Sequence, residues 1–186
     1  MNAVLLAGLG NPGGSYKNNR HNVGFRVMDA VADGGSFKKI ASLAEIMILS
    51  ASDQKIILSK PCTFMNLSGN AVKFLMDFYK IPDENVYVVH DDIDLDIGRV
   101  KIKKGGGNGG HNGLRSVDDL IGRNYWRLRI GVGRPREKSM ISSHVLGDFL
   151  PHEEEILHKI VAAIKENLPL LFSDVKKLER LLNFPA

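Results

Sequence analysis

Residues 1–32 read MNAVLLAGLGNPGGSYKNNRHNVGFRVMDAVA, an apolar run followed by a glycine-rich polar loop and an amphipathic segment. The apolar run from Met1 to Leu9 predicts a buried strand. The residues from about Asn22 to Ala32 place apolar side chains at helical spacing and predict a helix. A strand that leads into a helix through a polar loop is typical of an α/β domain. This stretch therefore decides the class of fold.

The rest of the chain continues to alternate strands and helices. Further strands are predicted at Phe37–Ile40, Ala44–Ser50, Lys55–Ser59, Asn85–His90, Arg99–Lys103 and Trp126–Val132. Helices are predicted from about Asn66 to Tyr79, Gly113 to Ile121, Pro151 to Asn167 and Ser173 to Leu182. A turn at Ser52–Gln54 makes a hairpin of the second and third of these strands. We expect a single α/β domain over residues 1–186, with a twisted mixed β-sheet flanked by helices on both faces.

Composition limits the class of protein. A chain of 186 residues with 44% hydrophobic and 25% charged residues has the size and balance of one globular domain. Its one cysteine, Cys62, excludes an internal disulfide and indicates a reducing compartment. Apolar runs such as Ala3–Ala7 are too short to span a bilayer. We expect a cytoplasmic protein with no membrane segment.

Positive charge is concentrated in one part of the chain. From Arg99 to Lys138 there are eleven Lys or Arg residues and three acidic residues, a local charge of +8, so the rest must sum to −4 to give the net +4. Lysines in this segment lead directly into the glycine loop that begins at Gly105. Such a patch predicts an anionic partner, most often a nucleic acid.

Gly8, Gly10 and Gly13 match the spacing of the G-x-G-x-x-G dinucleotide fingerprint. A working fingerprint needs a helix that begins at once and an acidic residue at the end of the second strand. Here the loop stays irregular well past the glycines, and Asp29 and Asp33 fall in or just after the first predicted helix. Dinucleotide binding is therefore a minor alternative.

The polar side chains favour a hydrolytic site. His21 lies at a loop-to-helix boundary, and imidazole titrates near neutrality, as a general base requires. Asp91 directly follows a buried strand, where α/β sheets place their sites, and is the expected orienting acid. Asn66 and Asn112 offer amides near helix starts, although asparagine is also an ordinary helix cap. Without a recognisable nucleophile elbow, these residues predict metal-free hydrolysis of an ester or amide by water.

The acidic run after this strand does not predict a metal site. Asp92, Asp94 and Asp96 alternate as in a calcium loop, but Ile97 takes the place of the required glycine and Lys103 that of the bidentate glutamate. A zinc site needs clustered histidines or cysteines, which the sequence lacks, so zinc at the scattered His90 and His111 is only a minor alternative. We therefore expect neither a metal ion nor a cofactor.

Several motifs follow one another along the chain. They are GLGNPG (8–13) with Tyr16 and RHNVGF (20–25), KPCTFMNLSG (60–69), HDDID (90–94) and GGHNGLRS (109–116), followed by RLRIGVGRP (127–135). Together they closely resemble the bacterial peptidyl-tRNA hydrolase family over nearly the whole chain. The resemblance implies a monomeric single-domain enzyme that cleaves the ester between a peptide and the 3′ ribose of tRNA, without a metal.

The resemblance also implies roles for individual residues. It makes His21 the base that activates water and Asp91 its orienting partner. In the binding cleft it places Asn11, Asn66 and Asn112 on the peptide portion and the reacting groups, Tyr16 and Met65 in the lining, and Lys103 and Arg129 at the 5′-phosphate of tRNA. Lys104 could exchange roles with Lys103, and Arg127 with Arg129. The basic segment alone would also suit a non-catalytic RNA-binding module.

Overall fold

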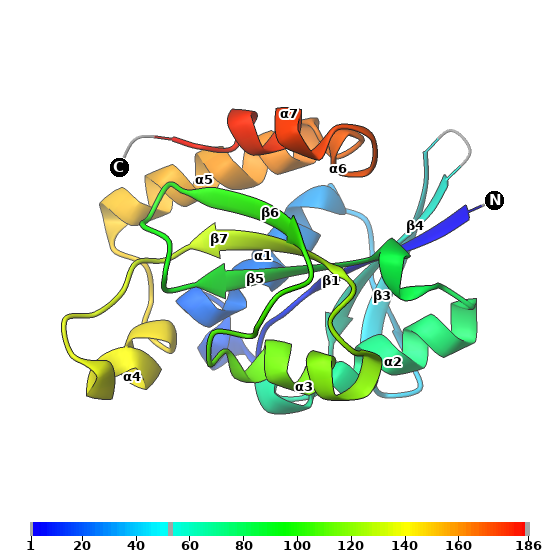
Figure 1. Cartoon of the computed structure of the whole chain (residues 1–186), viewed down its shortest axis with the longest axis horizontal. Coiled ribbons are helices and arrows are strands. Elements are labelled where there is room, and N and C mark those ends of the chain that lie inside the picture. The colour runs from blue at the N-terminus through cyan, green and yellow to red at the C-terminus, as the bar shows by residue number, and fades with distance from the viewer. Residues whose placement is uncertain (1, 52–53, 185–186) are drawn as a thin grey trace.

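The fold is built on one mixed sheet. The computed structural model describes residues 2–51 and 54–184, which form a seven-stranded sheet in the order β2-β3-β4-β1-β5-β7-β6 (Figure 1). The strands are β1 (Asn2–Gly8), β2 (Lys38–Ile40), β3 (Ala44–Ala51), β4 (Gln54–Pro61), β5 (Val86–Asp92), β6 (Val100–Lys104) and β7 (Trp126–Gly131). The four central strands β4, β1, β5 and β7 are parallel, whereas β3 and β6 run antiparallel to their neighbours.

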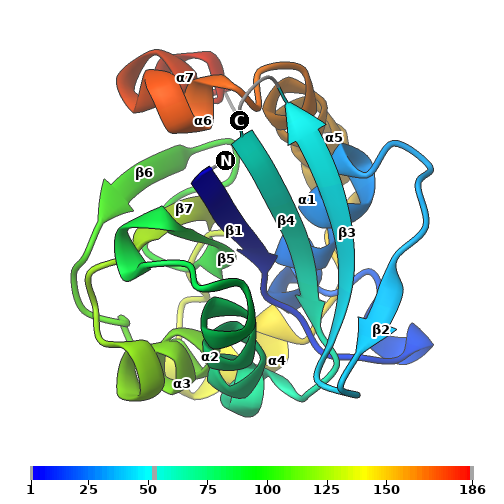
Figure 2. The same cartoon turned by 90° about the vertical axis from the view of Figure 1, so that its right-hand side faces the viewer.

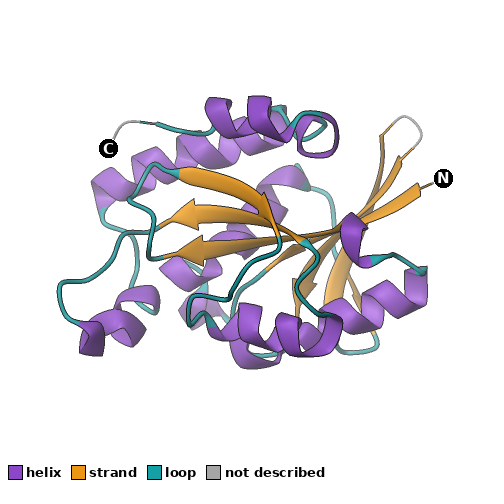
Figure 3. Cartoon of the chain, in the orientation of Figure 1, coloured by secondary structure: helices purple, strands orange, loops and turns teal. Residues whose placement is uncertain are grey.

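Helices cover both faces of the sheet (Figures 2 and 3). They are α1 (Val23–Val31), α2 (Ser68–Tyr79), α3 (Asn112–Ile121), α4 (Ile141–Val145), α5 (Pro151–Glu166), α6 (Leu170–Ser173) and α7 (Val175–Leu181). One buried core joins Val27 of α1 to Ile160 of α5 and includes residues of α6 and α7. The other core joins Leu75 of α2 to Val117 of α3. The predicted fold class, a mixed sheet flanked by helices on both faces, is confirmed.

The order of the strands predicts a crevice beside the carboxyl ends of the central strands. The chain leaves β1, crosses to β4 on one side of it, and then returns past β1 to β5 on the other side. The crossover helices α1 and α2 accordingly lie on opposite faces of the sheet. In an open α/β sheet, ligands bind beside the carboxyl ends of the strands where the direction of winding reverses. The ends of β1 and β5 form that point here.

Two glycines let the first helix approach the sheet closely. A Cβ on Gly8 would collide with the backbone of Gly24, and one on Gly24 would collide with the backbone of Leu9 and Val89. The first turn of α1 therefore lies directly on the ends of β1 and β5. The residues just before α1 therefore lie close to the residues at the carboxyl end of β5.

The structure differs from the expected elements in two places. No helix was predicted between residues 139 and 150, but α4 forms there. Its five residues are too few to show an apolar stripe. The helix predicted from Ser173 to Leu182 is instead α6 followed by α7, because the Asp174 side chain accepts a hydrogen bond from the Lys177 N–H at 3.0 Å and starts a new helix. The hairpin strands are as predicted, while the turn residues 52 and 53 lie outside the described part of the chain.

Among the described residues, none of the helices combines the length and the apolar character needed to cross a bilayer.

Replacing Gly24 by alanine should destabilise the protein by about 2–3 kcal/mol or more, because the added methyl group has only backbone to displace. Chemical unfolding of the variant measures this. The control is Gly14→Ala, where an added Cβ meets nothing within 4 Å and the unfolding free energy should change by less than about 0.5 kcal/mol. Equal stability of the two variants would contradict the close approach described here.

Candidate active site

A cleft of about 1430 Å³ opens at the carboxyl ends of β1 and β5. This is larger than the roughly 300–1000 Å³ of most small-molecule pockets. The nine residues expected at the site all line it: Asn11, Tyr16, His21, Met65, Asn66, Asp91, Lys103, Asn112 and Arg129. Residues that are distant in sequence therefore meet in one place.

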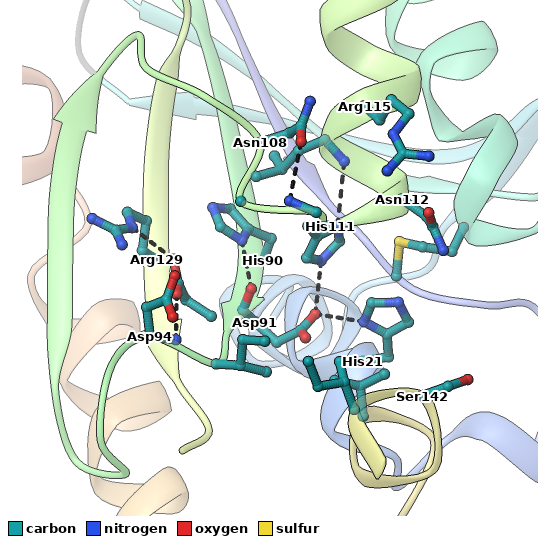
Figure 4. Close-up of a pocket in the computed structure, with 18 of the residues that line it drawn as sticks. His21, His90, Asp91, Asp94, Asn108, His111, Asn112, Arg115, Arg129 and Ser142 are labelled. Atoms are coloured by element: carbon teal, nitrogen blue, oxygen red, sulfur yellow. Dashed lines mark hydrogen bonds and ion pairs between the residues drawn. The ribbon is translucent and has the colours of Figure 1, made fainter. Parts of the chain in front are cut away.

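His21 and Asp91 are in direct contact in the floor of the cleft (Figure 4). His21 lies in a single 3-10 turn, Arg20–Asn22, that precedes α1, and its Nδ1 is 2.8 Å from Oδ1 of Asp91. An ionised carboxylate only accepts hydrogen bonds, so Nδ1 carries the proton. The other ring nitrogen, Nε2, points away from Asp91 and keeps a lone pair that can accept a proton.

A second histidine donates to the same carboxylate oxygen. His111 precedes α3, and its Nδ1 accepts the backbone N–H groups of Gly113 at 3.1 Å and Leu114 at 3.3 Å. Its Nε2 must then carry the proton, which it donates to Oδ1 of Asp91 at 2.9 Å. His111 thus caps a helix with one nitrogen and holds the orienting acid with the other.

The two imidazoles keep Asp91 ionised although its side chain is almost completely buried. Burial by itself would raise the pKa of this carboxyl group, but the adjacent His111 and His21 outweigh it and hold the pKa well below its usual range. The ligand-type atoms of the three residues lie within 4.8 Å of one another, as in a metal site. Both ring nitrogens that face Asp91 lie within hydrogen-bond distance of its Oδ1, so the three residues form one hydrogen-bonded network.

Asn11 is held by its side-chain oxygen, while its Nδ2 group has no hydrogen-bond partner among the described residues. Its Oδ1 accepts the backbone N–H of Met65 at 2.8 Å, which leaves the Nδ2 amide as a donor toward the cleft. Asn22 fixes the backbone of the same residue. It donates from Nδ2 to the carbonyl of Asn11 and accepts the N–H of Asn11 on Oδ1, both at 2.9 Å. A fixed amide donor can bind a carbonyl oxygen or an oxyanion.

The remaining neutral residues form the wall beside α3. Met65 is buried beneath Gly113, while Asn66 and Asn112 are exposed at the starts of two helices. Asn112 is the first residue of α3, and the helix cap is the preceding His111. The alternative interpretation of Asn112 as an ordinary helix cap is therefore wrong. The Tyr16 ring meets Phe64 edge to face, with centroids 6.3 Å apart, at the apolar mouth of this wall.

The opposite wall is basic and comes from β6 and β7. Arg129 donates from Nε to Asp92 at 2.7 Å, and its side chain is 21% exposed. Partial burial, and then the positive charge of Arg129 and Arg127, lower the pKa of Lys103. Lys104 is exposed and is not among the residues that line the cleft.

Arg127 is buried and is bonded to other parts of the chain. Its side chain is 1% exposed and donates to Asp118 at 2.7 Å and to the carbonyl of Gly107 at 2.5 Å. Tyr125 donates its hydroxyl to the same oxygen of Asp118 at 2.7 Å. Arg127 therefore anchors the glycine loop, whereas Arg129 reaches the open part of the cleft.

The comparisons with known proteins agree with this geometry. A family model described as peptidyl-tRNA hydrolase matches residues 5–185. A protein of that name from Bartonella henselae is 46% identical over 176 residues, which cover 94% of this chain and 91% of its own. Another from Rickettsia canadensis is 45% identical over 184 residues, covering 97% and 98% of the two chains. The chain belongs to the peptidyl-tRNA hydrolase family.

A solved structure supports the same family at the level of the fold. The crystal structure of peptidyl-tRNA hydrolase from Acinetobacter baumannii matches with a TM-score of 0.91 at 35% identity, covering 97% of this chain and 94% of that one. The architecture is thus that of a known member of the peptidyl-tRNA hydrolase family.

Two parts of the cleft, His111 and α4, have no role predicted from the sequence, and neither has the buried Asn22, which supports Asn11 but does not line the cleft. His111 and Asn22 stand inside the motifs typical of the peptidyl-tRNA hydrolase family, beside residues with predicted roles, but nothing in the sequence indicates which atoms they contact. The helix α4 contributes Ile141, Ser142 and Val145 to the cleft. The only signal for it was the position of this segment just after the basic strand β7.

His90, next to the orienting acid, is buried and neutral. Its Nδ1 donates to the carbonyl of Asp91 at 2.6 Å, and burial together with the adjacent His111 lowers its pKa to about 3. The unfolded chain binds a proton at this residue below its ordinary pKa of 6.5, whereas the folded chain does not until about pH 3. Its contribution to stability is present above pH 6.5 and is lost as the pH falls toward 3.

Replacing His90 by asparagine, whose amide can make the same hydrogen bond, should remove this pH dependence. Between pH 7 and pH 5 the wild-type protein should lose roughly 2 kcal/mol more unfolding free energy than the variant. Denaturant unfolding of both proteins at the two pH values checks it. Equal losses in both would show that His90 does not titrate as described.

Proposed function

We propose that the protein hydrolyses the ester bond between the peptide, or an N-blocked aminoacyl group, and the 3′ ribose of peptidyl-tRNA, releasing free tRNA and peptide. Family membership supports the substrate class. The observation that carries the mechanism is the 2.8 Å contact between Nδ1 of His21 and Asp91, which leaves Nε2 available as a base. The reaction needs no metal ion in this proposal, because water is the nucleophile and His21 takes its proton.

In the proposed reaction, Nε2 of His21 takes a proton from water as the oxygen attacks the ester carbonyl. The imidazolium that forms is stabilised by the Asp91 carboxylate on its other nitrogen. Collapse of the tetrahedral intermediate breaks the bond to the ribose oxygen, and the proton returns from His21 to that leaving oxygen. The donor from His111 fixes the carboxylate during these steps.

The neutral amides suit the other half of the chemistry. The Nδ2 donor of Asn11 is held in place before any substrate binds, so it can stabilise negative charge on the carbonyl oxygen without reorganising. Asn66 and Asn112 present exposed amides to the peptide on the same side. Such contacts can recognise a peptide bond, which an aminoacyl-tRNA with a free amino group lacks.

The basic wall is suited to the tRNA. Lys103 and Arg129 are the candidates for the 5′-phosphate, because burial and then the positive charge of Arg129 and Arg127 lower the pKa of Lys103, and a phosphate would offset that repulsion. Binding of this kind weakens as salt rises. The expected monomeric state, cytoplasmic location and independence from cofactors are parts of the same proposal.

Two other functions give different results. A non-catalytic RNA-binding module would bind tRNA in a salt-sensitive way with no ester cleavage. A dinucleotide-binding protein would be stabilised against unfolding by NAD. The His21, Asp91 and His111 network favours the hydrolase over both, since neither alternative needs a polarised imidazole.

The first test is cleavage of N-acetyl-aminoacyl-tRNA. His21→Ala and Asp91→Asn should each lower kcat by about 10²–10⁴, because the first removes the base and the second removes the acceptor that holds its tautomer. His158→Ala is the matched control, since the His158 side chain on α5 is 71% exposed and should leave turnover unchanged.

The same assay tests the absence of a metal. Addition of EDTA should leave wild-type turnover unchanged. Undiminished cleavage by His21→Ala would exclude the assigned base, and tRNA binding without cleavage by the wild type would favour the RNA-binding module.

A second test separates the two ends of the Asn11 amide. Asn11→Asp keeps the oxygen that accepts the Met65 N–H but replaces the Nδ2 donor, so kcat should fall by about 10²–10³ at a temperature where the variant is folded; the melting temperature should fall as well, because the new carboxylate is buried. Asn70→Asp, at an exposed position of α2, is the control for the added charge. Wild-type kcat in Asn11→Asp would rule out a donor role for this side chain.

A further inference from the structure

Arg20, the residue before His21, is buried and reaches across to a distant part of the chain. Its Nη2 donates to Glu153 in the first turn of α5 at 2.6 Å, and its Nη1 donates to the carbonyl of His144 at the end of α4 at 3.3 Å. Its backbone N–H donates to the carbonyl of Gly147 at 3.0 Å. One residue thus connects the turn that carries His21 to the segment from residue 144 to 153.

Neighbouring contacts make this connection specific. The Arg20 guanidinium lies over the ring of Phe149, 5.4 Å from its centroid. The oxygen of Glu153 that binds Arg20 also accepts the backbone N–H of Leu150 at 2.8 Å. Asn19 donates to Asp148 at 2.8 Å. The 144–153 segment is therefore fixed at several points, and Arg20 takes part in most of them.

The connected segment forms one wall of the cleft. Ile141, Ser142 and Val145 of α4 line it, and Figure 4 shows Ser142 on the side of the cleft where His21 lies. In Figure 1, α4 stands clear of the two helical layers that pack on the sheet. Besides its contact with Arg20, α4 is joined to the residue that follows β7: Nε2 of His144 lies 3.0 Å from the carbonyl oxygen of Val132. The position of this wall depends strongly on the contacts of Arg20.

We propose that Arg20 is a positioning residue for the reaction, which holds the α4 wall and the base His21 in one fixed relation. The proposal rests on the proposed function, because it concerns the placement of the ester against His21. Arg20 touches neither the substrate nor the reacting atoms. It acts through its neighbour His21 on one side and through α4 on the other.

The chain contains a matched control for this role. Arg26 of α1 donates to Glu154 of α5 at 2.6 and 2.8 Å and also lies over Phe149, 5.7 Å from its centroid. It forms a comparable ion pair between the same two helical regions. Unlike Arg20, Arg26 is not adjacent to His21 and makes no hydrogen bond to the backbone of residues 144–147 among the described contacts.

The experiment compares Arg20→Ala, Arg20→Lys, Glu153→Gln and Arg26→Ala at a temperature where each variant is folded. Arg20→Ala should lower kcat/KM for N-acetyl-aminoacyl-tRNA by about tenfold or more, with kcat reduced as well as KM raised, since small displacements of a base are costly. Arg20→Lys, which keeps the charge for Glu153, should recover part of the loss. Arg26→Ala should stay within about twofold of the wild type, as expected for a pair that only contributes stability.

Amide hydrogen exchange provides a readout that needs no substrate. Residues 141–147 should exchange faster in Arg20→Ala and at the wild-type rate in Arg26→Ala. If Arg20→Ala does not fold, Glu153→Gln and Arg20→Lys carry the same comparison against Arg26→Ala, with smaller losses in the same order.

Two results would overturn the proposal. One is wild-type kcat and KM in the folded Arg20 and Glu153 variants, and the other is an equal loss in Arg26→Ala. Failure of the proposed function looks different, because the wild-type protein itself would then not cleave the ester.

Discussion

The arrangement of the cleft depends on one buried carboxylate oxygen. Asp91 is the second-last residue of the central strand β5, and its side chain is 2% exposed. The negative charge on its carboxylate is tolerated because two imidazole N–H groups point at Oδ1. One donor, His21, comes from the turn before α1, and the other, His111, comes from the turn before α3. The constraint works in both directions. The carboxylate orients the histidines, and the histidines keep the carboxylate ionised.

Meeting this constraint requires three segments to approach closely. The missing side chains of Gly8 and Gly24 let α1 begin directly against β1 and β5, which brings His21 within reach of Asp91. On the other side, His111 is fixed by the backbone N–H groups at the start of α3, so the end of the glycine loop is tied to the same oxygen. Arg127 holds the middle of that loop from beneath. The glycine loop is therefore anchored at two points.

The sequence predicted the fold class and the residues that gather in the cleft, but not their connections. Residues 86–89 of β5 are a continuous apolar run, and the motif residues stand at the end of that strand, so the convergence of the motif residues follows from the topology of the sheet. The exchange of hydrogen bonds between Asn22 and Asn11 depends on how a loop folds back on itself, for which no spacing rule exists. Similarly, Arg127 and Arg129 both lie in β7, and the sequence does not distinguish them. The burial of each side chain does: Arg127 is buried and anchors the glycine loop, whereas Arg129 is partly exposed to the cleft. The short helix α4 was missed because its five residues are too few to show an apolar stripe, and its hydrogen bonds to Arg20 and Val132 join residues that are distant in the sequence.

Two walls of the cleft suit different parts of the proposed substrate. The side chains of Asn11, Asn66 and Asn112 are neutral amides, which suit peptide groups that carry dipoles but no charge, and Arg115 lines the cleft beside Asn112 (Figure 4). In the basic wall, Arg129 is already paired with Asp92, yet the pKa of Lys103 is lowered by burial and then by the positive charge of Arg129 and Arg127, so positive charge remains around Lys103. An incoming phosphate would offset that charge. His21 lines the same cleft as these amides and the basic side chains, so a molecule that uses both brings the junction between its peptide and its nucleic acid into the cleft that holds the base. The ester bond of peptidyl-tRNA is that junction.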